Sequence, residues 1–167
     1  MSLSILPPER LTLHHDTSQF SNGKHPALDS WLKERALASE GLSARTYVVC
    51  TPPSRVVGYY VLSTAMEQRV ALPSAKMRRN MPQQVPLILI GRLAVDATFQ
   101  GRGLGSDLLA DAIRRCCAAS EIAGVRAIVA HAIDEEAVGF YRRRGFILSP
   151  LGERIMLLPL ETAKAAL

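Results

Sequence analysis

Hydrophobic and polar positions follow two periods along the chain, one typical of helices and one typical of strands. Apolar residues at helical spacing predict amphipathic helices over residues 28–39, 104–116 and 137–141. Apolar, β-branched and aromatic runs predict a short first strand around Leu11 and Leu13 and further strands at residues 46–50, 56–62, 87–95, 125–130, 146–148 and 155–158. The 167 residues, 48% of them hydrophobic, suffice for the core of one domain, 1–167.

Turn and capping residues mark where several of these elements begin and end. Residues 51–55 and 149–152 carry the turn chemistry of two hairpins. Asp134 is placed to cap the helix that follows it. Gly124 is expected to close the second helix, and Gly145 fits the position after the third helix, where φ > 0 is favoured.

Residues 67–86 break the periodic pattern, with prolines and a cluster of basic residues on a possible short helix. A segment of this length is either functional or a solvated linker, and composition leaves both interpretations open. Trp31 is expected to pack in the core. His14 and His15 are interpreted as surface or hydrogen-bonding residues, because neighbours in a strand point to opposite faces. Residues 163–167 are assigned no role.

The most informative stretch joins the apolar strand at residues 87–95 to the helix that begins near Leu104. It reads Gln100-Gly101-Arg102-Gly103-Leu104-Gly105. Three glycines in five residues let the backbone approach a ligand closely. The N–H groups of the helix's first turn and the positive end of its dipole point at the same place. The stretch therefore predicts an anion site, with phosphate as the expected anion.

Known phosphate loops match this stretch to different degrees. Gly105 is followed by Ser106 and Asp107 with no lysine, which argues against a nucleotide-triphosphate loop. A dinucleotide fingerprint fits poorly because Ser106 stands where its last glycine belongs, although Glu121 lies near the distance expected for a ribose-binding acid. An ordinary glycine-rich turn before a helix remains a further alternative.

The pattern Gln-x-x-Gly-x-Gly resembles the coenzyme A pyrophosphate loop of the GNAT acyltransferases. Residues 137–146, about forty positions further on, resemble the closing GNAT segment, in which a helix ends in Tyr and Gly-Phe enters a strand. Further segments resemble the GNAT toxins of bacterial type II toxin–antitoxin systems, so that the similarity covers nearly the whole chain: residues 45–49, 57–60, 91–96, 108–112 and 131–134. The resemblance implies an α/β GNAT fold, with a central mixed, mostly antiparallel twisted sheet that is splayed at its central strand and flanked by helices.

The resemblance also implies where acetyl-CoA binds. The pantetheine arm is expected along the central strand and the pyrophosphate at the glycine-rich turn, which involves Leu93, Ala94, Val95, Gln100, Gly101, Arg102, Gly103, Leu104, Gly105 and Ser106. Tyr141 matches the family's proton donor to the departing sulfur. A phenol with a reference pKa of about 10 stays protonated at neutral pH and can protonate a thiolate whose pKa is about 8.5.

The toxin-like segments imply an acetyl-CoA-dependent N-acetyltransferase that acetylates the α-amino group of aminoacyl-tRNA and blocks translation. Such an amine has a pKa of about 7.7 to 8.0, so an appreciable fraction is neutral and no strong base is needed. His131, Glu135 and Glu136 are candidate bases, and the base stays unassigned. One alternative is an N-acetyltransferase for a protein N-terminus, a lysine or a polyamine. Another is a non-catalytic CoA-binding regulatory module.

The balance of 20 Lys and Arg against 15 Asp and Glu gives a net charge of +5, which favours a polyanionic partner. The residues expected to form a basic rim for tRNA are Lys76, Arg78, Arg79, Arg92 and Arg142. Arg143 and Arg144 are explained equally well as solvated charges. The resemblance further implies a ribbon-helix-helix antitoxin and a homodimer.

Cys50, Cys116 and Cys117 lack metal-ligand spacing, so no metal site is predicted, and buried thiols in a reducing cytoplasm explain them. No stretch reaches the roughly eighteen apolar residues that a membrane span needs. Residues 1–8 have neither a basic start nor a long apolar run. The sequence thus predicts a cytoplasmic protein with no membrane partner.

Overall fold

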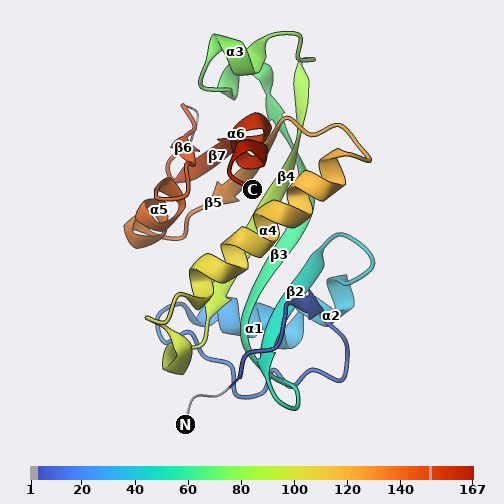
Figure 1. Cartoon of the computed structure of the whole chain (residues 1–167), viewed down its shortest axis with the longest axis vertical. Coiled ribbons are helices and arrows are strands. Elements are labelled where there is room, and N and C mark those ends of the chain that lie inside the picture. The colour runs from blue at the N-terminus through green and yellow to red at the C-terminus, as the bar shows by residue number, and fades with distance from the viewer. Residues whose placement is uncertain (1–3, 151) are drawn as a thin grey trace. The chain divides into compact units, whose positions relative to one another are not determined.

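Seven strands form a mixed sheet in the order β1-β2-β3-β4-β5-β7-β6 in the computed structural model, which describes residues 4–150 and 152–167. The strands are β1 (Glu9–Arg10), β2 (Arg45–Thr51), β3 (Arg55–Gln68), β4 (Gln84–Val95), β5 (Ala127–His131), β6 (Ile147–Leu148) and β7 (Ile155–Pro159) (Figure 1). β1–β2, β2–β3, β5–β7 and β6–β7 pair antiparallel, whereas β4 and β5 pair in parallel. The predicted mixed, mostly antiparallel sheet is confirmed.

The helices are α1 (Pro26–Glu34), α2 (Ala36–Ser39), α3 (Ala75–Arg78), α4 (Leu104–Ser120), α5 (Glu135–Arg142) and α6 (Leu160–Ala165), with 3-10 turns η1 (Arg69–Ala71) and η2 (Ala97–Phe99). Contacts group the chain into two units. The first contains the residues up to 63 together with 92–112, and the second contains 64–91 and 113–167. β3, β4 and α4, which Figure 1 shows as long continuous elements, contribute residues to both units.

The core of the first unit lies between α1 and strands β2 and β3. Tyr59 of β3 is fully buried, and its hydroxyl donates to the carbonyl of Leu28 at 2.7 Å. The ring of Trp31 stacks on Tyr59 at 6.2 Å, and Phe20 meets the same ring edge-on at 5.6 Å. Aromatic pairs in these arrangements add stability beyond the area that they bury. Trp31 itself is half-buried and packs against this core, so its packing role is confirmed but its predicted position within the core is not.

The core of the second unit joins α3 to strands β4, β5 and β7 through a cluster that contains Leu72, Met77, Val85, Leu87, Ala127, Val129 and Leu157. Arg126 ties the rim of this core together. Its guanidinium donates from Nε to the carbonyl of Met77 at 3.1 Å and from Nη1 to Glu161 at 2.6 Å. Residues 67–86 are therefore packed structure: β3 runs through to Gln68, the predicted short helix forms as α3, and β4 starts at Gln84.

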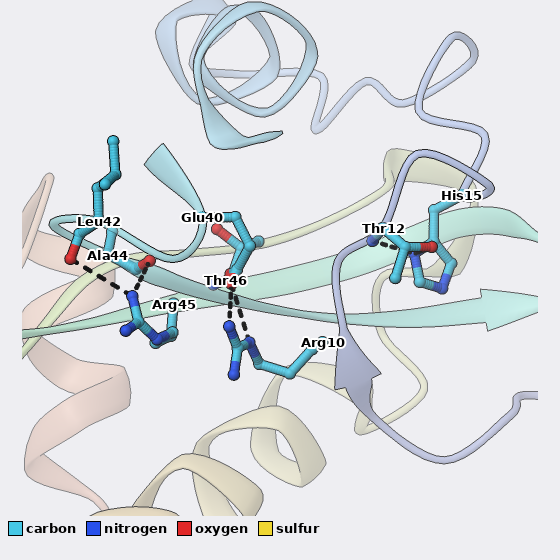
Figure 2. Close-up of polar contacts among 8 residues, drawn as sticks. All are labelled: Arg10, Thr12, His15, Glu40, Leu42, Ala44, Arg45 and Thr46. Carbon is cyan, nitrogen blue, oxygen red and sulfur yellow. Dashed lines mark hydrogen bonds and ion pairs between the residues drawn. The ribbon is translucent and has the colours of Figure 1, made fainter. Parts of the chain in front are cut away.

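Polar contacts close the β1 edge of the first unit (Figure 2). The Glu40 carboxylate accepts two hydrogen bonds from the Arg10 guanidinium, at 2.6 and 2.8 Å, and one from the Thr46 N–H at 2.7 Å. One carboxylate therefore joins three segments of the chain. His15 accepts the Thr12 N–H on Nδ1 at 2.9 Å and contacts Glu9 through Nε2 at 2.7 Å. The hydrogen-bonding role predicted for His15 is confirmed.

Two predicted elements are placed differently in the first unit. The first strand lies at Glu9–Arg10, because the chain turns at Thr12, where its carbonyl accepts the His15 N–H, and leaves Leu13 74% exposed. The helix predicted over residues 28–39 breaks at Arg35, whose φ of −121° is not helical. The break turns Ala36 into the core, where it is fully buried.

The second unit also departs from two expectations. Gly124 does not close α4, because the helix already ends at Ser120, whose hydroxyl donates to the Cys117 carbonyl at 2.6 Å. Residues 163–167, for which the sequence indicates no role, begin within α6, where Ala163 is buried. The predicted turn at residues 149–152 includes Leu151, which lies outside the described residues.

All three cysteines are buried free thiols, as predicted. Burial raises the pKa of Cys50 to about 11 and the pKa of Cys116 to about 12. Thiolate is the reactive form of cysteine, so these side chains are inert packing residues at neutral pH. Within residues 4–150 and 152–167, no cluster of His, Cys, Asp and Glu is suited to a metal ion.

Candidate active site

The glycine-rich turn has backbone angles that only glycine adopts readily. Gly101 has φ of +77° and Gly103 has φ of +82°. A Cβ atom added at either position would meet nothing within 4 Å. Packing therefore does not explain these glycines. They shape the backbone and leave open space in front of the first turn of α4, as an anion site at a helix N-terminus requires.

The start of the turn is fixed by Gln100. Its Nε2 donates to the carbonyl of Val95 at 2.9 Å, at the end of β4, and to the carbonyl of Asn22 at 2.8 Å. An amide NH₂ group has two donors, so both are used within the protein. Gln100, predicted to bind the cofactor, thus holds the turn in place.

Positive charge gathers beside the turn on the ring of Phe99. The guanidinium carbons of Arg102 and Arg55 lie 5.1 and 5.8 Å from the ring centre. Asp96 is buried, and its carboxylate lies 3.9 Å from the Arg55 guanidinium. Burial alone would raise the pKa of Asp96. Hydrogen bonds from Thr98 and from the Ser21 N–H hold that pKa below the ordinary value. The negative charge of the ionised Asp96 offsets the positive charge of Arg55. The charge of Arg102 adds to the positive charge next to the predicted phosphate position.

The end of β4 carries the predicted pantetheine-binding residues. The parallel ladder between β4 and β5 covers Leu87 to Ile90 of β4 and stops before Leu93. Leu93 and Val95 are half-buried, and Ala94 is part of the core. The backbone of Leu93 and Val95 thus lies beyond the parallel pairing.

Tyr141 lies in the second unit, near the end of α5. Its ring is 5.3 Å from the ring of Phe140 and 5.3 Å from that of Phe146. Asp134 caps the helix by accepting the Ala137 N–H at 2.8 Å, and Gly145 has φ of +96°, so both local predictions are confirmed.

The Tyr141 phenol is set up as a proton donor. Burial raises its pKa above the ordinary value for tyrosine, because an apolar setting disfavours the charged form. No residue within 4–150 or 152–167 hydrogen-bonds its hydroxyl. The group is therefore protonated throughout the neutral range and keeps its O–H for a ligand.

The predicted tRNA-binding residues fall into both units, and each is described in its own surroundings. Lys76, Arg79 and Arg142 are exposed. Arg78 is half-buried and donates from Nη1 to the Leu72 carbonyl at 2.6 Å. The guanidinium of Arg92 lies 4.4 Å above the ring of Trp31. Arg78 and Arg92 therefore have structural contacts that the sequence did not indicate, and the convergence of the five residues stays a prediction.

Comparison with known proteins decides the family. The family described as acetyltransferase (GNAT) domain matches residues 43–148. The chain belongs to this family. It is 43% identical to the "tRNA-acetylating toxin" of Mycobacterium tuberculosis over 159 residues, which is 95% of this chain and 94% of that protein.

Two solved structures of AtaT are similar to this GNAT chain. AtaT complexed with acetyl-methionyl-tRNAfMet has a TM-score of 0.90 and 29% identity, with 98% of this chain and 99% of that chain covered. A tyrosine-to-phenylalanine mutant of the AtaT toxin, bound to the C-terminus of the antitoxin AtaR and acetyl-CoA, has a TM-score of 0.81 and 26% identity, with 98% and 97% covered.

The GNAT family confirms the predicted activity, N-acetyl transfer, and the predicted donor, acetyl-CoA. The turn suits this donor, because the open space at two positive-φ glycines and the guanidinium of Arg102 would accept a diphosphate. The three candidate bases, His131, Glu135 and Glu136, are exposed, and the base stays unassigned. No described helix of this GNAT chain has the length and apolar character that a membrane crossing requires.

Sequence reasoning missed the residues that support the turn of this GNAT protein. Asn22, Arg55 and Phe99 all contact the turn or its flanks, although Asn22 and Arg55 lie more than 40 residues before it. The only signal was Asn22-Gly23, a pair typical of tight turns. That pair predicts a turn, and it says nothing about which segment the turn contacts.

Proposed function

We propose that the chain acetylates the α-amino group of aminoacyl-tRNA with acetyl-CoA and so acts as a toxin that blocks translation. The observation that carries this proposal is the 43% identity to a tRNA-acetylating toxin over 95% of the chain. The likeness to AtaT, solved with acetyl-methionyl-tRNAfMet, supports the same substrate class. An acetylated α-amino group is no longer a nucleophile, so the modified aminoacyl-tRNA cannot accept a peptide.

In the proposed site, the diphosphate of acetyl-CoA binds the glycine-rich turn from Gly101 to Ser106, and the pantetheine arm follows Leu93 to Val95. The open space at the glycines and the end of the parallel ladder at Ile90 support these placements. Acetyl-CoA supplies an activated acetyl group as a thioester. Backbone N–H groups and Arg102 supply positive charge, which offsets the charge of the phosphates.

Tyr141 is proposed to protonate the leaving sulfur. The neutral amine attacks the thioester carbon, the C–N bond forms and the C–S bond breaks. The thiolate takes the phenol proton, the amine releases a proton to solvent, and the Tyr141 phenolate regains a proton from solvent before the next turnover. Burial makes the phenol a weaker acid, and the same apolar setting makes a desolvated thiolate more basic. The proton therefore transfers late, once charge has developed on sulfur.

This assignment predicts the pH dependence of the reaction. Because the pKa of Tyr141 is raised, its proton is not lost as the pH rises through the neutral range, and only the acceptor amine titrates there. We expect kcat/KM to rise about tenfold per pH unit up to about pH 8 and then to stay level to about pH 10. The measurement should use an amide-linked aminoacyl-tRNA analogue, which resists hydrolysis. A decline between pH 8 and 10 would mean that the donor is a more acidic group.

The exposed basic residues of α3 are proposed to contact tRNA phosphates. Arg78 donates a hydrogen bond to the Leu72 carbonyl, so its replacement would also disturb the local structure. The test therefore combines Lys76→Ala with Arg79→Ala, which replace exposed side chains. We expect weaker tRNA binding and a slope of log affinity against log salt that is smaller by up to about 1.8, since each phosphate contact contributes about 0.7 to 0.9. Acetyl-CoA affinity should not change. Lys33→Ala, at an exposed lysine of α1, is the control for the loss of one surface positive charge outside α3. An unaltered slope would remove α3 from the tRNA site.

Further parts of the proposal concern assembly. Both units are proposed to form one acetyltransferase domain, 1–167, which is supported by the family match over residues 43–148 because that range draws on both units. From the family resemblance, we propose that the protein is a cytoplasmic homodimer and that its partner is a ribbon-helix-helix antitoxin. The complex of AtaT with the antitoxin AtaR supports an antitoxin partner. Light scattering of the purified protein tests the dimer.

A competition assay tests the substrate class. Radiolabelled acetyl-CoA is incubated with the protein and an equimolar mixture of charged tRNA, a peptide with a free N-terminus, free lysine and spermidine. We expect label in the charged tRNA fraction and none in deacylated tRNA. Label in the peptide or the amines alone would favour the alternative acceptors. Coenzyme A binding with no labelled product would favour a regulatory module.

A further inference from the structure

The loop before α1 is hydrogen-bonded to the segment that carries the glycine-rich turn. The Ala97 N–H donates to the Ser21 carbonyl at 2.8 Å, and the Ser21 N–H donates to Asp96 Oδ2 at 3.1 Å. The side chain of Gln100 completes the link by donating to the Asn22 carbonyl at 2.8 Å. Two segments more than 70 residues apart in the sequence thus form one hydrogen-bonded structure.

The side chain of Asn22 forms hydrogen bonds within its own loop and to α1. It is buried, and its Nδ2 donates to the His25 carbonyl at 2.6 Å and to Asp29 Oδ1 at 2.7 Å. Its Oδ1 accepts the N–H groups of Lys24 at 3.0 Å and His25 at 2.7 Å, and its own N–H donates to Asp29 at 2.9 Å. The side chain therefore holds the loop against the first turn of α1 and fixes the direction of the Asn22 carbonyl.

Close packing supports the same contact. Gly23 follows Asn22 with φ of +83°, and a Cβ atom there would lie 3.2 Å from the Cβ of Ala97. A side chain at this position would push the loop away from η2. The glycine thus lets the loop approach the residues that lead into the turn.

The turn itself has few other supports. Gly101, Arg102 and Gly103 are exposed, and neither glycine has a neighbour at its Cβ position. Immediately before them, the side chain of Gln100 donates to two carbonyls, those of Asn22 and Val95. Backbone N–H groups recognise an anion only when their geometry is held, so the support at the start of the turn bears on affinity.

We propose that Asn22 is a positioning residue for the cofactor: it acts through Gln100 to hold the glycine-rich turn in the conformation that binds the diphosphate of acetyl-CoA. This inference rests on the proposed use of the turn as the diphosphate site. Asn22 does not touch the donor, and it acts through the carbonyl that Gln100 binds.

The test compares two donors, acetyl-CoA and acetyl-pantetheine, which has the same thioester and lacks the diphosphate. With Asn22→Ala we expect the KM for acetyl-CoA to rise about tenfold, as for a lost hydrogen-bonded link. The kcat at saturating acetyl-CoA and the kcat/KM for acetyl-pantetheine should stay close to wild type. A variant that is merely less stable loses activity with both donors equally, and that result would overturn the inference.

A double-mutant cycle identifies the route. Gln100→Ala removes the other side of the link at an exposed side chain and should raise the KM for acetyl-CoA by a similar factor. Because both substitutions break the same link, the double variant should be little worse than either single one. If the two increases in KM multiply in the double variant, Asn22 and Gln100 act independently, and the proposed link between them is wrong. Ser18→Ala, which loses only the Asp16 contact of an exposed loop, is the control and should have no effect.

Two results separate this inference from the function on which it rests. Should Asn22→Ala fail to fold, Gln100→Ala decides alone, and an unchanged KM for acetyl-CoA would refute the link. If the wild-type protein has the same KM for both donors, the turn does not bind the diphosphate, and the proposed site fails together with the inference.

Discussion

Replacing Tyr141 with Phe should lower the kcat for acetyl transfer by roughly 100-fold to 10,000-fold, the range typical of a general acid. The ring keeps its contacts with Phe140 and Phe146, because only the hydroxyl oxygen is lost. That hydroxyl has no hydrogen-bond partner among residues 4–150 and 152–167, so its removal leaves no protein group unpaired. Stopped-flow or quench measurements of a single turnover report the chemical step directly.

Three readouts accompany this result. The melting temperature and the dissociation constant for coenzyme A should stay at wild-type values, and growth inhibition on expression should disappear. Tyr47→Phe is the matched control, since Tyr47 of β2 stacks on Tyr60 of β3 and is not part of the proposed site. If Tyr141→Phe turns over normally, the proton comes from another source, such as water.

Gly103→Val should reduce acetyl-CoA affinity by roughly 100-fold or more. A side chain at φ of +82° strains the backbone by about 1 to 2 kcal/mol, and a β-branched residue is disfavoured most. A shifted turn also loses hydrogen bonds to a charged phosphate, each worth about 1.5 to 3 kcal/mol. About 1.4 kcal/mol corresponds to a factor of ten, so the loss of two such hydrogen bonds, about 3 kcal/mol or more, is enough for the stated loss of affinity.

Gly41→Val separates the effect of backbone strain on stability from the effect of a changed turn on acetyl-CoA binding. Gly41 has φ of +85° and also has nothing within 4 Å of its Cβ position, but it lies in the loop between α2 and β2. Both variants should lose a similar amount of stability in denaturant unfolding, and only Gly103→Val should lose acetyl-CoA affinity by calorimetry. Equal affinity losses would show that general destabilisation, and not the turn, lowers binding.

The sequence predicted the parts of this protein that local chemistry decides. Glycine is favoured where φ is positive, so Gly101, Gly103 and Gly145 could be interpreted from residue type alone. Asp134 caps its helix for an equally local reason, because its carboxylate reaches an N–H three residues ahead.

Features that depend on distant contacts could not be predicted from the sequence. The helix breaks at Arg35 because Ala36 must reach the core, and no residue type signals this. Arg78 and Arg92 are basic residues in sequence, but one holds a backbone carbonyl and the other covers the ring of Trp31. The support of Gln100 by Asn22 depends in the same way on contacts across the sequence.

The position of the transferred acetyl group on the product decides whether the protein acetylates aminoacyl-tRNA. Charged tRNA is incubated with acetyl-CoA and the protein, digested with a single-strand nuclease, and the terminal aminoacyl-adenosine is analysed by tandem mass spectrometry. We expect one added acetyl group on the α-amino nitrogen with the wild-type protein, and almost none with Tyr141→Phe under the same conditions. Acetyl groups found only on nucleosides, on side-chain amines or on added proteins, with the aminoacyl-adenosine unmodified, would refute acetylation of the α-amino group.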